Sequence, residues 1–324
     1  MTWFRHALPV NGRTLDRMLI WAAALLVIAI VAFAAYYYVD QRLQKDTAST
    51  GTPKHELAVY EQAVRDDPQD PVARASLAQL YFAAGRYDEA VEQYQAVLTL
   101  DETSIAALLG LGRAQLAAGD ATAATESFEK IITLTAGAEM AGSITESAHY
   151  YIGNIALDQQ RPADAVAHLK EAVAIEPGDA DAWHILGAAY LANGDLDESI
   201  EALSRAVLFV PNFTEAYDKL AAAYQAKGMV GESRYARGMA AYSRAQHDEA
   251  LRELQAATEA SPTFADAYAG LGLTYEARSE RDLAIGAYQR ALQLDPASFT
   301  AQNGLARLGA SATTTAAEPT RTTP

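Results

Sequence analysis

Apolar side chains follow two different patterns along this chain. From residue 54 to residue 309 they recur three and four positions apart, which is typical of amphipathic helices and not of strands. Earlier in the chain, residues 18–39 form an uninterrupted run without a charged side chain. The pattern therefore predicts an all-α protein with one long apolar helix near its N-terminus and a large set of shorter amphipathic helices after it.

The apolar run has the length and the flanks of a membrane helix. At 1.5 Å per residue, a helix of residues 18–39 spans a hydrocarbon core of about 30 Å. Trp21 lies near one end and three tyrosines at 36–38 lie near the other, where aromatic rings favour the membrane interfaces. We predict a transmembrane helix at 18–39, preceded by a short basic tail at 1–17 and followed by a linker at 40–53.

The orientation of this helix is predicted from the architecture, because basic residues occur on both sides of it and do not decide the matter. A short basic tail before a long apolar helix resembles an uncleaved signal anchor, which exports the rest of the chain. We therefore expect a single-pass membrane protein whose soluble region is extracytoplasmic. A cleaved signal peptide is the alternative, since Ala32-Phe33-Ala34 imitates a cleavage site.

A pair of helices recurs through residues 54–309. Four segments superimpose without gaps: GRYDEAVEQYQAVLTLD from Gly85, GDATAATESFEKIITLT from Gly119, GDLDESIEALSRAVLFVP from Gly194 and SERDLAIGAYQRALQLDP from Ser279. The equivalent small residues of the second helix are Ala90, Ala124, Ala165, Ser199, Ala250 and Ala284. They lie 34, 41, 34, 51 and 34 residues apart. A spacing of 34 is one helix-turn-helix unit, 41 adds a seven-residue insertion, and 51 equals one and a half units.

The 51-residue interval predicts a helix that belongs to two units. Thr214 to Lys227 matches a first helix and His247 to Ala260 matches a second helix, and only Val230 to Arg244 lies between them. This single helix must close one unit and open the next. We expect it to contact both neighbours and to break the array near residues 228–245.

The repeated pattern resembles the tetratricopeptide repeat (TPR) family. The matching first-helix positions are a large residue (Trp183, Tyr217, Tyr268), a Leu-Gly or Leu-Ala pair (Leu111-Gly112, Leu186-Gly187, Leu220-Ala221) and an aromatic residue (Tyr81, Tyr190, Tyr224). The resemblance implies a TPR-type helix-turn-helix solenoid at 54–309, with about six repeats plus extra helices, in which neighbouring units supply each other's core. The remaining residues 310–324 lack apolar periodicity, and we expect them to be disordered.

Composition and charge exclude several functions. The chain has 324 residues, no cysteine and a net charge of −16, which argues against nucleic-acid binding and excludes thiolate metal sites. No two histidines have the i, i+4 spacing of a helical metal site, so neither a metal nor a cofactor is expected. Paired carboxylates are interpreted as helix-start charges rather than catalytic pairs, and we predict that the protein is not an enzyme. These pairs are Asp66-Asp67, Asp88-Glu89, Asp197-Glu198 and Asp248-Glu249.

The resemblance also implies a binding surface. In this family the first helices form the inner, concave surface, and the core pattern leaves twelve positions free for it: Gln79, Phe82, Leu109, Arg113, Leu116, Tyr150, Asn154, Leu157, His184, Leu191, Tyr235 and Tyr242. This set holds one arginine and no lysine, so the clamp that some members use for a peptide's terminal carboxylate is not expected. Aromatic, aliphatic and amide groups suit an extended peptide or an amphipathic helix.

Two classes of function follow from these features. The first is a membrane-anchored TPR scaffold that binds a protein or peptide partner in an envelope assembly or maturation complex. The alternative is an accessory subunit that positions a catalytic partner, such as cytochrome c maturation or glycan synthesis machinery. The pattern leaves the oligomeric state open.

Overall fold

A computed structural model of the protein describes residues 53–137 and 142–311. The predicted basic tail, the predicted membrane helix and residues 312–324 lie outside the described residues, as does the linker up to residue 52. None of the helices within the described residues combines the length and hydrophobicity needed to cross a lipid bilayer.

All regular structure in the described ranges is helical, which confirms the predicted class. The chain divides into two compact units, Met1–Glu102 and Thr103–Pro324. The helices of the first unit are α2 (Pro53–Asp66), α3 (Pro71–Ala83) and α4 (Tyr87–Leu100). Those of the second unit are α5 (Ile105–Ala117), α6 (Ala121–Thr135), α7 (Gly142–Asp158), α8 (Pro162–Ile175), α9 (Ala180–Asn193), α10 (Leu196–Phe209), α11 (Thr214–Ala226), α12 (Val230–Ser243), α13 (His247–Ala260), α14 (Ala265–Ala277), α15 (Arg281–Leu294) and α16 (Phe299–Arg307).

In the first unit, α3 packs against both α2 and α4. Leu77 and Tyr81 of α3 are buried together with Tyr94 of α4, and the Tyr81 hydroxyl donates a 3.1 Å hydrogen bond to Glu61 of α2. Asp70 precedes α3 and accepts hydrogen bonds from main-chain N–H groups of its first turn. An N-terminal cap and a shared apolar face therefore hold this unit together.

Acidic side chains begin several helices, as predicted. The first turns of α4, α10 and α13 each contain two carboxylates, where they face the positive end of the helix dipole. For the Asp66-Asp67 pair the prediction is wrong. Asp66 is the last residue of α2 and Asp67 lies in the turn that follows. These two carboxylates therefore lie at the end of α2, and the next helix, α3, begins only at Pro71.

In every helix pair of the second unit except α11–α12, which has Ala221, a glycine in the first helix faces a large residue 16 positions later. A Cβ atom on Gly187 of α9 would lie 2.5 Å from Cγ of Leu203 on α10. The same holds for Gly112 against Phe128 and for Gly272 against Tyr288. A larger residue at these glycines would meet the facing side chain, which explains the Leu-Gly pairs of the repeat.

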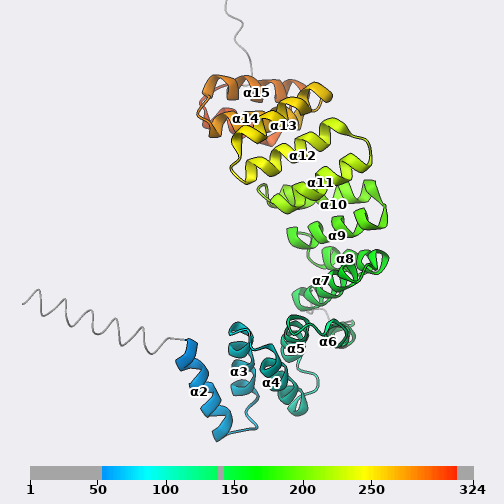
Figure 1. Ribbon diagram of the computed structural model, residues 1–324, viewed down its shortest axis with the longest axis vertical. Coiled ribbons are helices and arrows are strands. Elements are labelled where there is room, and N and C mark those ends of the chain that lie inside the picture. Colours follow the sequence, from blue (N-terminus) through cyan, green and yellow to red (C-terminus); the bar gives the residue numbers. More distant parts are fainter. Residues whose placement is uncertain (1–52, 138–141, 312–324) are drawn as a thin grey trace, which may run out of the picture. The chain divides into compact units, whose positions relative to one another are not determined.

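The second unit is a stack of antiparallel helices in which alternate helices also touch (Figure 1). Contacts join α5 with α7, α7 with α9 and α9 with α11. A second such series joins α12 with α14 and α14 with α16. The first-helix series therefore ends at α11 and a new one begins at the next helix, α12.

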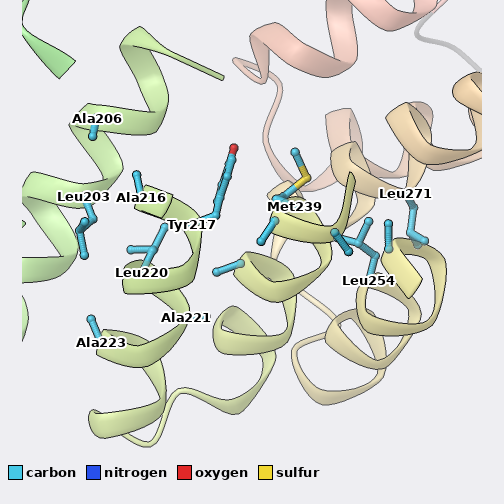
Figure 2. Close-up of a cluster of buried hydrophobic side chains, with 14 residues drawn as sticks. Leu203, Ala206, Ala216, Tyr217, Leu220, Ala221, Ala223, Met239, Leu254 and Leu271 are labelled. Atoms are coloured by element: carbon cyan, nitrogen blue, oxygen red, sulfur yellow. The ribbon is translucent and has the colours of Figure 1, made fainter. Parts of the chain in front are cut away.

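Helix α12 belongs to two helix pairs, and the prediction that it contacts both neighbours is confirmed. As a second helix, it places Ser233 against α11, where Oγ donates to the Ala221 carbonyl, as Ser199 of α10 does to α9. As a first helix, it places Gly238 against Leu254 of α13. Figure 2 shows the buried cluster that α11, α12 and α13 build together. Because consecutive helices are antiparallel, one extra helix reverses the direction of the later first helices.

Candidate functional site

The structure brings together most of the predicted inner-surface residues. Gln79 and Phe82 lie on α3 in the first unit, and the other ten lie in the second unit. Eight of those ten lie on α5, α7 and α9: Leu109, Arg113, Leu116, Tyr150, Asn154, Leu157, His184 and Leu191. Since α5 contacts α7 and α7 contacts α9, these side chains share one run of neighbouring helices. Their contact with a partner stays a prediction.

Carboxylates gather around Tyr150 of α7. Burial raises the pKa of its phenol, and the nearby negative charges of Asp181 and Asp179 raise it further. Glu146, one helical turn earlier, is itself buried, and its pKa is raised to about 7 by burial and by the charge of Asp179. Acidic and phenolic groups from α7 and from the start of α9 therefore occupy the same region.

His184 of α9 has an unsatisfied ring nitrogen. Its Nε2 atom is buried and has no hydrogen-bond partner among the described residues. The ring packs at 4.8 Å from the ring of Phe213. Burial lowers the pKa of the imidazole and the positive charge of Lys219 lowers it further, against the opposing charges of Asp181 and Glu215. The imidazole is therefore neutral near pH 7 and carries a nitrogen that can still form a hydrogen bond.

The two predicted residues on α12 take part in packing. Tyr235 lies 6.4 Å from Tyr217 and 5.1 Å from Phe264, edge to face in both cases. Tyr242 packs against the core cluster, with its ring 6.0 Å from that of His247. Both side chains therefore contribute to packing within the second unit, and their contact with a partner stays a prediction.

A cavity of about 400 Å³ lies between α8, α9 and α10 and includes none of the twelve predicted residues. Its lining residues are Lys170, Val173, Ala174, Pro177, Trp183, Leu186, Tyr190, Glu198, Glu201, Ala202 and Arg205. The Arg205 guanidinium lies 4.6 Å above the Trp183 ring and pairs with Glu201 at 2.8 Å. The sequence feature that could have indicated this cavity is Trp183, a tryptophan at the large-residue position of the repeat.

Two histidines, one on α7 and one on α8, face each other. They are 19 residues apart in the sequence, so no helical spacing predicted this contact. The Nδ1 atoms of His149 and His168 lie 3.2 Å apart. Burial lowers the pKa of His149, and the nearby charge of His168 lowers it further. One imidazole can donate to the other. Within the described ranges, no three histidine or carboxylate side chains gather as a metal site would require.

Comparison with known families agrees with the repeat. Tetratricopeptide repeat models match residues 57–98 and 156–224, residues 106–134 and residues 235–299, and a TPR repeat model matches residues 78–119. Together the matches include parts of both compact units, and they leave out residues 225–234, where α12 begins.

Two solved structures with TM-scores of at least 0.50 share the fold. The C-terminal part of a TPR repeat-containing protein from Cytophaga hutchinsonii is 16% identical with a TM-score of 0.52, covering 83% of this chain and 98% of that one. A double mutant of MamA RS-1 is 22% identical with a TM-score of 0.50, covering 55% and 96%. A MamA protein is 25% identical with a TM-score of 0.49, covering 55% and 94%. The glycine-mediated helix pairs and the family matches together show that the chain belongs to the tetratricopeptide repeat family.

Proposed function

We propose that this protein is a membrane-anchored TPR scaffold that binds a protein partner on the surface formed by α5, α7 and α9. The observation that carries the proposal is the placement of eight predicted side chains on these three helices, each of which contacts the next. The surface acts by binding, and any chemistry belongs to the partner.

The charges around this surface favour a partner segment with basic residues. Carboxylates of Glu146, Asp179 and Asp181 lie near Tyr150, and the chain as a whole has a net charge of −16. Lysine or arginine side chains can pair with such carboxylates and stack on the phenol. Leu109, Leu116 and Leu157 supply apolar contacts, so the partner segment combines basic with apolar residues, as an extended peptide or an amphipathic helix does.

The anchor in this proposal is the apolar run at residues 18–39, with the repeats on the extracytoplasmic side. A reporter enzyme fused after Pro324 that is active only outside the cytoplasm supports this orientation. Activity restricted to the cytoplasm rejects it. A mature N-terminus just after Ala34 rejects the anchor in favour of a cleaved signal peptide.

Site-specific crosslinking in intact membranes tests the binding surface. A photoreactive amino acid is placed singly at Tyr150, Asn154 or His184, and at two exposed second-helix controls, Lys130 of α6 and Glu259 of α13. We expect one discrete partner to be captured from the three surface positions and not from the controls. Equal capture from both groups, or from the controls alone, contradicts the proposed surface.

A further inference from the structure

The cavity beside Trp183 has a counterpart 34 residues later in which the space is filled. Tyr217 of α11 is equivalent to Trp183, Tyr235 of α12 is equivalent to Glu201, and Met239 is equivalent to Arg205. Tyr217 and Met239 are buried in one cluster, with 4% of each exposed (Figure 2). The ring of Tyr235 meets the ring of Tyr217 edge to face at 6.4 Å. The chain therefore closes this position with its own aromatic side chain in the next unit.

At Trp183 the equivalent space stays open. Glu201 and Arg205 pair with each other along α10, and Arg205 lies over the Trp183 ring, so the two side chains line the space without filling it as Tyr235 and Met239 do. Trp183 is held in place, because its Nε1 donates a 2.9 Å hydrogen bond to the Pro177 carbonyl. A cavity of about 400 Å³ results, floored by an indole ring that cannot easily turn away.

Part of this arrangement recurs and part does not. In the α13–α15 region, Tyr268 donates to the Pro262 carbonyl at 3.3 Å and Arg290 lies 5.6 Å above its ring. The stacked arginine is thus a feature of the repeat. The charged groups at the rim differ in that region, because Lys170 and Glu198 correspond to Gln255 and Leu283. Neither Lys170 nor Glu198 forms an ion pair with another described residue.

We propose that the cavity between α8, α9 and α10 binds a tyrosine side chain of a partner protein. Its ring packs beside Trp183 and Arg205 in the cavity, as the ring of Tyr235 packs beside Tyr217, and its hydroxyl donates to the Glu198 carboxylate at the rim. The cavity volume falls within the range of small-ligand pockets, about 300 to 1,000 Å³. This site is separate from the α5–α9 surface, so it stands whether or not that surface binds a partner.

The test uses N-acetyl-L-tyrosinamide as the probe and saturation-transfer NMR on the full chain in lipid nanodiscs, with empty nanodiscs as the blank. The double variant Glu201→Tyr/Arg205→Met places the side chains of Tyr235 and Met239 at the open site. The control Glu56→Tyr/Arg65→Met makes the same changes at exposed positions of α2. Wild type and control are expected to transfer saturation to the probe's ring protons, and the double variant is expected to lose this signal.

Three results overturn the proposal. They are an absence of transfer in the wild type, unchanged transfer in the double variant, and stronger transfer to N-acetyl-L-leucinamide than to the tyrosine probe. If the double variant does not fold, Glu201→Tyr alone, which keeps Arg205 on Trp183, carries the test. If Glu198→Gln loses transfer to N-acetyl-L-tyrosinamide but keeps its transfer to N-acetyl-L-phenylalaninamide, which lacks the hydroxyl, the assigned role of the carboxylate is supported.

Discussion

The hydroxyl of Ser233 donates a 2.9 Å hydrogen bond to the main-chain carbonyl of Ala221. Ser199 makes the equivalent bond to Gly187 at 2.8 Å, also across 12 residues. The bond marks α12 as the second helix of a pair with α11. Five residues later, Gly238 faces Leu254 and marks the same helix as the first of a pair with α13. One helix thus carries the side-chain signatures of both positions in the repeat.

We predict that α12 is sensitive to substitution on both faces. Ser233→Ala is expected to cost about 1 kcal/mol of unfolding free energy, because a buried hydrogen bond is lost. Gly238→Ala is expected to cost about 1 to 3 kcal/mol, because its Cβ would lie 2.6 Å from Cγ of Leu254. Urea denaturation followed by circular dichroism measures both. Wild-type stability in either variant would mean that α12 serves only one pair.

The glycines of the helix pairs differ from glycines on open helix surfaces. Gly187→Ala is expected to destabilise by about 1 to 3 kcal/mol, because the added methyl group meets Leu203. Gly286→Ala on α15 has open space around it and is expected to stabilise by about 0.5 to 1 kcal/mol through helix propensity. Thermal midpoints that shift in the same direction in both variants contradict the packing described here.

In three helix pairs the turn contains a residue with positive φ that is not glycine. These residues are Gln160 (φ +58°), Ala245 (φ +58°) and Ser279 (φ +64°), and other pairs have Gly85, Gly119 and Gly194 at this position. We predict that Ala245→Gly stabilises the chain by about 0.5 to 1 kcal/mol, because relief of the strained φ exceeds the added entropy of the unfolded chain. Gly194→Ala is the reverse control and is expected to destabilise. A lower midpoint for Ala245→Gly would contradict this.

Glu146 predicts a pH dependence of stability. Its pKa is raised to about 7 in the folded chain by burial and by Asp179, above the ordinary value of 4.5, so the unfolded state gives up this proton first. The contribution of the protonated Glu146 side chain to the free energy of unfolding is fully present below pH 4.5 and is lost as the pH rises through 7. We expect the stability difference between Glu146→Gln and wild type to favour the variant increasingly from pH 5 to pH 8, as measured by denaturation at each pH. A difference that does not change with pH contradicts the shift.

Periodicity within a helix and between repeats could be read from the sequence. The predicted shared helix, Val230 to Arg244, differs from α12 by one residue at its end. The repeated segment that starts at Gly85 likewise contains a helix, α4, which begins two residues later at Tyr87. Both depend on contacts three, four or 34 residues apart, which leave a regular record of small and large residues.

Contacts between helices whose residues lie at irregular sequence separations leave no repeated pattern of small and large residues. His149 meets His168, and Glu146 lies near Asp179, because α7 packs against α8 and α9. The cavity at Trp183 exists because Glu201 and Arg205 leave part of the space beside the indole ring unfilled. An alignment of the repeats, position by position, does not reveal such a space. The aromatic contacts of Tyr235 with Tyr217 and Phe264 likewise join different helices at separations that do not repeat along the chain.

The claim that the α5–α9 surface binds a basic and apolar segment is tested most directly by isothermal titration. The ligand is the partner segment recovered by crosslinking, and the proteins are wild type, Asp181→Asn/Tyr150→Ala and the exposed second-helix control Glu259→Gln. The account predicts that the double variant weakens binding about tenfold or more, whereas the control binds as the wild type does and wild-type affinity falls with added salt. Equal affinity for all three proteins would contradict it.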